Sequence, residues 1–172
     1  MPNAATHDAI TLVTGVAGTA IAWNLDLPDF GVVNASVLLG SYILSGLLFS
    51  PDLDLHSRPY TRWRWLRWIW LPYRRMAGHH RSWISHSLIW GPLIRILYFM
   101  CIMTLLSLGV LMLLGLLMPI DPTGSMEQFM YDVWVWISLH PSTVGYALAG
   151  FFLGSASHVI ADALVTGFKR VF

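Results

Sequence analysis

The stretch Leu88–Met118, LIWGPLIRILYFMCIMTLLSLGVLMLLGLLM, decides the fold class of this chain, because Arg95 is its only charged residue. A helix of about 20 apolar residues crosses the hydrocarbon core of a bilayer. The stretch is longer than one crossing needs, so we expect it to begin at the membrane surface, with Arg95 paired there or reaching toward the interface. It predicts an all-α integral membrane protein.

Outward from this stretch, further transmembrane helices are predicted over residues 10–23, 32–49 and 143–165. The first is short and rich in small residues, which suits packing against other helices, and it spans only if it begins near Thr6 or His7. Residues 129–139 are too few to cross and are expected to lie in the interface. We therefore expect residues 1–172 to form one domain, a bundle of about four transmembrane helices.

The composition supports a membrane protein and limits its chemistry. Hydrophobic residues make up 56% of the chain and charged residues 11%, whereas a soluble domain carries about 25% charged residues. The single cysteine, Cys101, permits no internal disulfide and no cysteine-based zinc site. The N-terminus has no Lys or Arg before the first apolar stretch, so we expect that helix to be retained rather than cleaved as a signal peptide.

Positive charge is distributed unevenly along the chain. Seven of the ten Lys and Arg residues lie between the second apolar stretch and the third, Arg95 lies near the start of the third, and two follow the fourth. The connections 24–31 and 120–142 contain neither residue. Because loops rich in Lys and Arg stay in the cytoplasm, we expect the loop 50–87 and both termini to face the cytoplasm.

The segment 57–75, SRPYTRWRWLRWIWLPYRR, alternates Arg with Trp. This pattern is typical of an interfacial segment that rests on anionic lipid headgroups. Such a loop either fixes the topology or recognises lipid specifically, and the pattern is equally consistent with both. Nucleic-acid-binding proteins also combine basic and aromatic residues, but a position between two spans argues against nucleic acid.

His and Asp residues gather at the predicted cytoplasmic face. Such side chains are costly near hydrocarbon and are often functional there. Four separate segments contribute them: His7 and Asp8; Asp52 and Asp54; His79, His80 and His86; His158 and Asp162. His140 falls at the opposite face and is excluded, and His56 and His79 are left undecided.

The local spacing within these segments indicates a metal site. His158 and Asp162 are four residues apart, so they share one face of a helix. Asp52 and Asp54 follow Pro51, where alternate residues of an extended chain point the same way. Imidazole and carboxylate ligands suit Zn²⁺, Mn²⁺ or Fe. So many donors exceed what one tetrahedral zinc needs, and a site of two or three ions would ionise water and clamp a phosphoryl group.

Each segment taken alone also has a structural explanation. Residues 52–54 suit a C-terminal turn, and residues 158–162 suit a hydrogen-bonded pair within a bundle. Residues 79–81 suit contacts with headgroups, and the acidic residue of 7–8 suits a helix N-terminus. The gathering of all four segments at one face favours metal binding.

At these motifs the sequence resembles small bacterial membrane-bound, metal-dependent hydrolases of the LexA-regulated type. It resembles in particular their relatives described as metal-binding membrane proteins, from cyanobacteria among others. The shared pattern is an N-terminal His, then Pro-Asp-x-Asp, then His-Arg followed by (Ser/Thr)-His-Ser, then Ser-His-x-x-x-Asp. In this chain these are His7, Pro51–Asp54, His80–Ser87 and Ser157–Asp162.

The resemblance implies a bacterial inner-membrane protein with a helical domain similar to zinc-dependent phospholipase C and the P1-type nucleases, which hydrolyse phosphodiesters. The ligands it implies are His7, Asp52, His80, His86, His158 and Asp162, with Asp54 as a ligand or beside one. In those hydrolases the two His residues of the His-Arg motif are five apart, whereas His80 and His86 are six apart. No second His-x-x-x-Glu follows, so we expect one or two ions, with Zn²⁺ first among the candidates.

Two functions follow from this pattern. One is a metal-dependent hydrolase of a phosphoester, such as a phospholipid, in which Asp54 acts as general base and Arg81 steadies the phosphate charge. The other is a non-catalytic metal-binding membrane protein, a carrier, sensor or assembly factor that docks a protein partner through the 57–75 segment. A transporter is disfavoured because no polar path connects the two faces.

Overall fold

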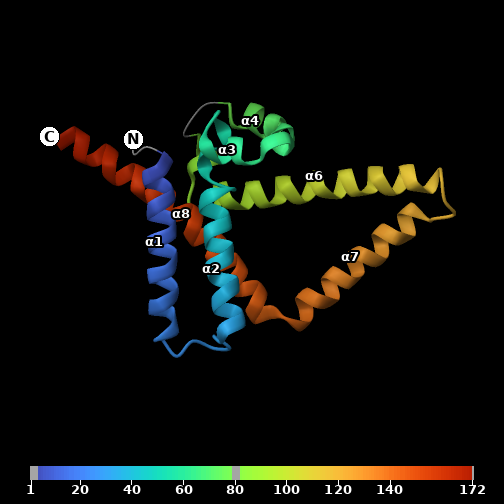
Figure 1. Cartoon of the computed structure of the whole chain (residues 1–172), viewed down its shortest axis with the longest axis horizontal. Coiled ribbons are helices and arrows are strands. Elements are labelled where there is room, and N and C mark those ends of the chain that lie inside the picture. Colours follow the sequence, from blue (N-terminus) through green and yellow to red (C-terminus); the bar gives the residue numbers. More distant parts are fainter. Residues whose placement is uncertain (1–3, 79–81, 172) are drawn as a thin grey trace.

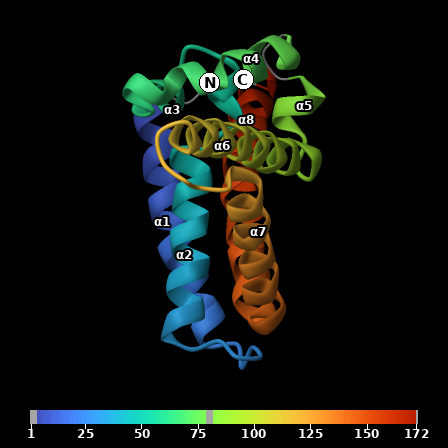
Figure 2. The same ribbon diagram turned by 90° about the vertical axis from the view of Figure 1, so that its right-hand side faces the viewer.

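The computed structural model describes residues 4–78 and 82–171, and this part of the chain forms helices and no strand. The predicted all-α class is therefore confirmed. Three long helices make the body of the molecule: α1 (Ala4–Trp23), α2 (Val32–Leu47) and α8 (Pro141–Val171). They stand side by side in Figures 1 and 2, and both ends of the described chain lie at the same end of this bundle.

Close backbone contact holds α2 against α8. A Cβ atom added at Gly150 would clash with the backbone carbonyl of Leu38, and one added at Gly154 would clash with the carbonyl of Tyr42. Small residues permit this approach between membrane helices. The small-residue positions of α8 thus set how the helix that carries His158 is placed against α2.

Five short elements follow α2 and cover one end of the bundle (Figures 1 and 2). They are η1 (Pro51–Asp54), α3 (Arg58–Arg62), η2 (Arg64–Trp70), α4 (Leu71–Ala77) and α5 (Trp83–His86), together called the cap. The cap has an apolar core in which the side chains of Leu53, Trp70 and Tyr73 are fully buried. Part of the Arg/Trp segment, including Trp70 and Tyr73, is therefore folded into the protein, while Trp65 and Trp68 stay exposed.

The cap is fastened to the last turn of α2. Arg62 donates a hydrogen bond of 2.9 Å to the carbonyl of Leu47, and the indole of Trp63 donates one of 3.0 Å to the carbonyl of Leu48. Carbonyls at a helix C-terminus have no partner within the helix. These bonds satisfy them and fix the point from which η1 departs.

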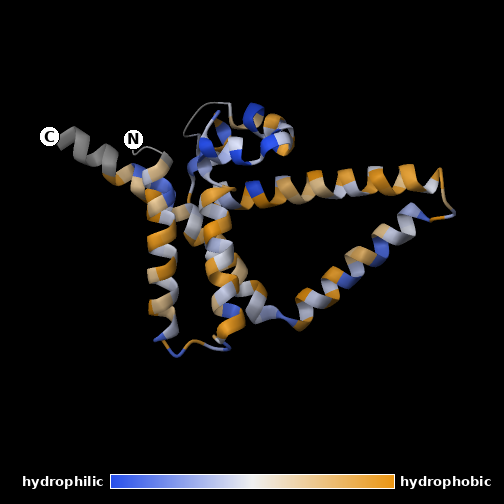
Figure 3. Ribbon diagram, in the orientation of Figure 1, coloured by the Kyte–Doolittle hydropathy of each residue, from blue (hydrophilic) through white to orange (hydrophobic). Residues whose placement is uncertain are grey.

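Helices α6 (Trp90–Gly115) and α7 (Pro122–Leu139) form an arm that leaves the bundle near the cap and returns to the start of α8 (Figure 1). Apolar residues predominate along the whole of α6 (Figure 3). At its base, the fully buried Arg95 donates hydrogen bonds of 2.7 Å to the carbonyl of Ser85 and 2.6 Å to the hydroxyl of Ser155. The expectation that Arg95 is paired near the start of this helix is confirmed.

Three segments of the described chain are long and apolar enough to cross a membrane, namely Val32–Asp54, Trp90–Gly115 and Pro141–Leu164. Helix α1 is not among them, so the predicted four spans reduce to three candidates. The first turns of α1 contain the polar residues Thr6, His7 and Asp8, which lower the hydropathy of this helix. The segment 129–139 belongs to the longer helix α7, which is not a candidate span either.

Candidate metal centre

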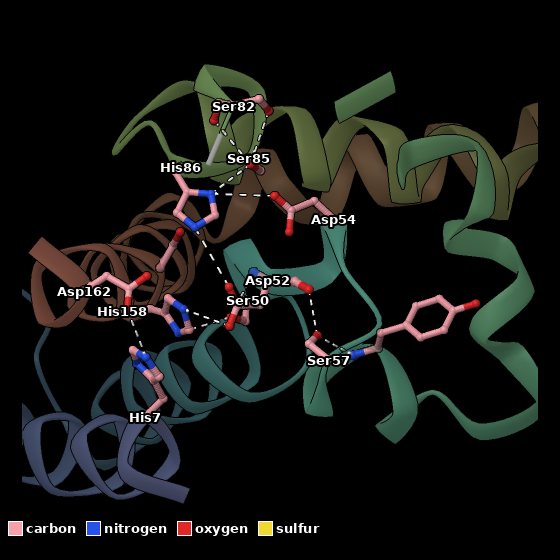
Figure 4. A network of polar contacts seen from close by, with 12 residues as sticks. His7, Ser50, Asp52, Asp54, Ser57, Ser82, Ser85, His86, His158 and Asp162 are labelled. Carbon is pink, nitrogen blue, oxygen red and sulfur yellow. Dashed lines mark hydrogen bonds and ion pairs between the residues drawn. The ribbon is translucent and has the colours of Figure 1, made fainter. Parts of the chain in front are cut away.

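Six of the seven predicted ligands meet where η1 and α5 of the cap converge with α1 and α8 (Figure 4). His7 lies in the first turn of α1, and His158 and Asp162 lie on α8. Asp52 and Asp54 lie in η1, and His86 is the last residue of α5. Residues from opposite ends of the sequence thus form one cluster, which we call the His/Asp cluster; its six members are His7, Asp52, Asp54, His86, His158 and Asp162.

Three of these side chains form the tightest group. One nitrogen each of His7 and His158 and one carboxylate oxygen of Asp162 all lie within 4.8 Å of one another, and all three residues are buried. His7 Nε2 is 3.2 Å from Asp162 Oδ1. The His7 and His158 rings are stacked with their centroids 4.0 Å apart. Two imidazoles and a carboxylate at this spacing are a ligand set that a zinc-like ion accepts.

Asp52 connects this group to a second one. Its Oδ2 is 3.3 Å from His158 Nε2, and its Oδ1 is 3.9 Å from His86 Nε2. His86 Nδ1 is in turn 3.8 Å from Asp54 Oδ2. The two oxygens of one carboxylate therefore face two different imidazoles, and the cluster is continuous from His7 to Asp54.

Ser50 determines how η1 presents Asp52. Its hydroxyl caps η1 by accepting a bond of 3.4 Å from the backbone N–H of Asp52, and Pro51 occupies the first helical position. The same hydroxyl is 3.2 Å from His158 Nδ1. Because a hydrogen bond to one ring nitrogen orients the imidazole, it directs the other nitrogen toward Asp52.

His86 is held in a similar way from α5 and α6. The Ser85 hydroxyl lies 2.8 Å from His86 Nδ1, and the Ser85 carbonyl accepts the hydrogen bond from Arg95. The buried guanidinium also lies close enough to Asp54 and Asp52 to interact with their charges. Arg95 thus supports the His86 side of the cluster both by position and by charge.

Two nitrogens of the cluster are poised for a ligand. Within residues 4–78 and 82–164, the buried atoms His7 Nδ1 and His158 Nε2 have no hydrogen-bond partner of suitable geometry. An unsatisfied buried polar atom costs about 1–3 kcal/mol, and a bound cation would remove this cost for His158. Burial first, and the neighbouring His158 second, lower the pKa of His7, which favours the neutral imidazole that binds metal.

Other predicted residues are not among these six. His79, His80 and Arg81 fall outside the described residues. His56 is exposed and contacts the ring of Tyr60, and His140 stacks on Trp136 at 4.6 Å at the far end of α8. Asp8 pairs with Arg58 and Arg62 of α3.

Sequence reasoning missed the groups that hold the ligands in place. The hydroxyls of Ser50, Ser85 and Ser155 all take part in this support. Ser50 had a recognisable signal, since Ser before Pro is a common helix start. The roles of Ser85 and Ser155 depend on contacts across the fold, and no local pattern indicates them.

The comparisons agree with this geometry at the level of a family. A family model described as "Uncharacterized metal-binding protein (DUF2227)" matches residues 2–172. The chain belongs to this family. Membership in DUF2227 shows that the chain belongs to a family of metal-binding proteins. The resemblance to LexA-regulated hydrolases and the assignment of individual ligands stay predictions.

One curated relative adds little to the DUF2227 match. An "Uncharacterized protein" of Aquifex aeolicus (strain VF5) is 40% identical over 58 residues, which are 33% of this chain and 40% of that protein. The chain therefore spans about 40% of the length of this relative. No solved structure matches the chain.

Proposed function

We propose that this protein holds two divalent metal ions in the His/Asp cluster and hydrolyses a phosphoester at the cytoplasmic face of the bacterial inner membrane. The observation that carries the proposal is the position of Asp52 between two imidazoles. A carboxylate that turns one oxygen to each of two sites is a suitable bridging ligand. Paired ions about 3.5–4 Å apart are a recurrent device of phosphoester hydrolysis.

The cluster divides into two ligand sets about Asp52. The first comprises His7, His158 and Asp162 with Asp52 Oδ2, and the second comprises His86 and Asp54 with Asp52 Oδ1. Mixed nitrogen and oxygen ligands fit Zn²⁺, Mn²⁺ or Fe²⁺. When bound, the ions would lower the pKa of a water molecule and stabilise charge on the phosphoryl group.

The chain's own residues would orient the reactants. Asp54 lies at the end of the cluster and would accept the proton of the attacking water as general base. Arg95 places a positive charge near both η1 carboxylates. Arg81, four residues before Ser85, would neutralise charge on the phosphate.

A second candidate function is non-catalytic metal binding, as a carrier, a sensor or an assembly factor. The deep burial of His158, Asp162 and Asp54 favours it, because these groups offer little room for a substrate. The cap also presents Trp65 and Trp68 to the outside, with Trp65 77% exposed. Such aromatic groups suit a protein partner as well as a lipid surface.

An assay of metal-loaded protein separates the two functions. Purified full-length protein would be loaded with Zn²⁺, Mn²⁺ or Fe²⁺ and assayed on bis-p-nitrophenyl phosphate and on phospholipid vesicles. We expect turnover that a chelator abolishes and that His158→Ala reduces by at least about 100-fold, while the control His140→Ala keeps wild-type turnover. Bound metal without turnover would favour the non-catalytic function, and absence of metal under every loading would refute both.

A further inference from the structure

A groove of about 550 Å³ lies between α1 and α8 on the flank of the bundle. Ile10, Thr14 and Gly18 form its α1 wall, and Leu153, Ile160 and Leu164 line it from α8. The three α8 side chains are each at least half exposed. Its volume falls within the roughly 300–1,000 Å³ of small-molecule sites.

The groove presents a hydrocarbon surface although some of its residues carry hydroxyls. Thr14 donates a 2.6 Å hydrogen bond to the carbonyl of Ile10 and lies 2.7 Å from the Tyr42 hydroxyl. Ser157 donates to the carbonyl of Gly154 at 2.8 Å. These polar groups are satisfied within the protein, so the groove suits an apolar guest.

One end of the groove adjoins the His/Asp cluster. His7, Ile10, Thr14 and Gly18 succeed one another at helical spacing along a single face of α1. On α8, the lining residues Ser157 and Ala161 immediately precede His158 and Asp162 in the chain. At 1.5 Å per residue, the wall from Ile10 to Gly18 is about 12 Å long and runs away from His7.

Positive charge stands at the same end. Arg58 Nη1 is 3.3 Å from Asp8 Oδ2, and Arg62 Nη2 also contacts this oxygen. Two guanidinium groups thus face one carboxylate, and the Arg58 side chain is 55% exposed. The exposed part of Arg58 is able to contact an anionic phosphate.

We propose that the groove holds one acyl chain of an anionic phospholipid whose phosphoester lies at the His/Asp cluster. This rests on the proposed hydrolase function and names its substrate class. Because the segment Pro141–Leu164 is a candidate span, its exposed side faces lipid chains in a membrane. An acyl chain in the groove would extend from the hydrocarbon of the bilayer to the metal ligands.

A groove-filling substitution with a matched control tests this. A side chain at Gly18 would enter open space in the groove, and one at Gly40, on the exposed side of α2, would also meet nothing within 4 Å. Full-length Gly18→Leu, Gly40→Leu and wild-type proteins would be placed in phosphatidylcholine vesicles containing phosphatidylglycerol with a photoreactive diazirine in its acyl chain. The labelled residues would then be mapped by mass spectrometry.

We expect labelling of wild type to concentrate on residues 10–18 and 153–164, with about a tenfold loss in Gly18→Leu and none in Gly40→Leu. Labelling spread evenly over the apolar helices, or equal in the two variants, would overturn the inference. So would a groove that stays unlabelled in the wild-type protein.

The hydrolysis assay then distinguishes this inference from the function on which it rests. Gly18→Leu should raise KM for long-chain phosphatidylglycerol about tenfold and leave turnover of the soluble bis-p-nitrophenyl phosphate unchanged. Groove labelling without hydrolysis of any ester would refute the hydrolase while supporting the lipid site. Hydrolysis of both esters without groove labelling would support the hydrolase and refute the lipid site.

Discussion

Arg95 is the residue at which the chain places a full charge out of contact with water. Its two hydrogen bonds join the base of α6 to Ser85 and Ser155. Since a buried cation is tolerated only when its surroundings compensate it, the carboxylates of η1 and these two oxygens are part of one arrangement. Arg95 therefore links the stability of the arm to the geometry of the cluster.

Replacement of Arg95 tests this link. Arg95→Met leaves the Ser85 carbonyl and the nearby carboxylates without their cation, so we expect a loss of about 3–5 kcal/mol in stability. Arg95→Lys keeps the charge but not the forked geometry, and should lose less. Thermal unfolding in detergent, followed by circular dichroism, measures both; a Met variant as stable as wild type would contradict the arrangement.

His7 gives the metal-free protein a predictable response to pH. Its pKa in the fold is below the usual 6.5, so the unfolded chain binds a proton more readily. Stability from this residue is complete above pH 6.5 and decreases as the pH falls below that value. We expect unfolding midpoints measured in chelator to fall with acidification in this window, and His7→Gln to weaken the trend; an identical trend in both proteins would exclude His7 as its source.

At the scale of elements, the packing of α2 on α8 positions the α8 ligands of the His/Asp cluster relative to η1. Gly154 sits where a methyl group would meet the backbone of Tyr42, which cannot rotate away, whereas Gly145 has open space around it. We expect Gly154→Ala to destabilise the protein by about 1–3 kcal/mol. Gly145→Ala should be neutral or stabilising by up to about 1 kcal/mol, because alanine favours helix. Equal effects of the two substitutions in thermal unfolding would show that the close contact between Gly154 and the Tyr42 backbone does not determine stability.

The apolar helices were predictable because their composition alone requires them. The α2, α6 and α8 segments are continuous hydrophobic runs, and their predicted positions agree with the structure within a few residues at most of their ends. The arm's second helix was predicted too short. A signal for its true start existed: Asp121 Oδ1 accepts hydrogen bonds from the backbone and hydroxyl of Thr123, with Pro122 between them. The backbone hydrogen bond from Gly124, together with these bonds from Thr123, lowers the pKa of Asp121.

The folded structure of the cap could not be predicted from the sequence. That the 57–75 segment rests on headgroups stays a prediction, but the sequence did not indicate that Trp63 and Trp70 pack edge to face against Phe49. Which tryptophans turn inward depends on contacts with α2 and α6, and no local period reveals it. The same holds for the cluster, where spacing predicted the gathering of ligands but not the position of Asp52 between His158 and His86.

At the scale of the whole molecule, the cap, the cluster and both ends of the described chain share one end of the bundle (Figure 1). The connections 24–31 and 120–142 lack Lys and Arg, which predicts that they face away from the cytoplasm. In a Cys101→Ser background, we expect Asp26→Cys to react with an impermeant maleimide on spheroplasts. Arg67→Cys should react only after permeabilisation, and the reverse pattern would invert the topology.

The bridging position of Asp52 is the centre of the account, and counting metal ions tests it most directly. Wild type, Asp52→Asn and the distant control Asp26→Asn would be loaded with Zn²⁺, freed of excess by gel filtration, and measured by inductively coupled plasma mass spectrometry. The account predicts two ions per chain in wild type and in Asp26→Asn, and at most one in Asp52→Asn. A wild-type protein without bound metal, or an Asp52→Asn protein that holds as many ions as wild type, would contradict it.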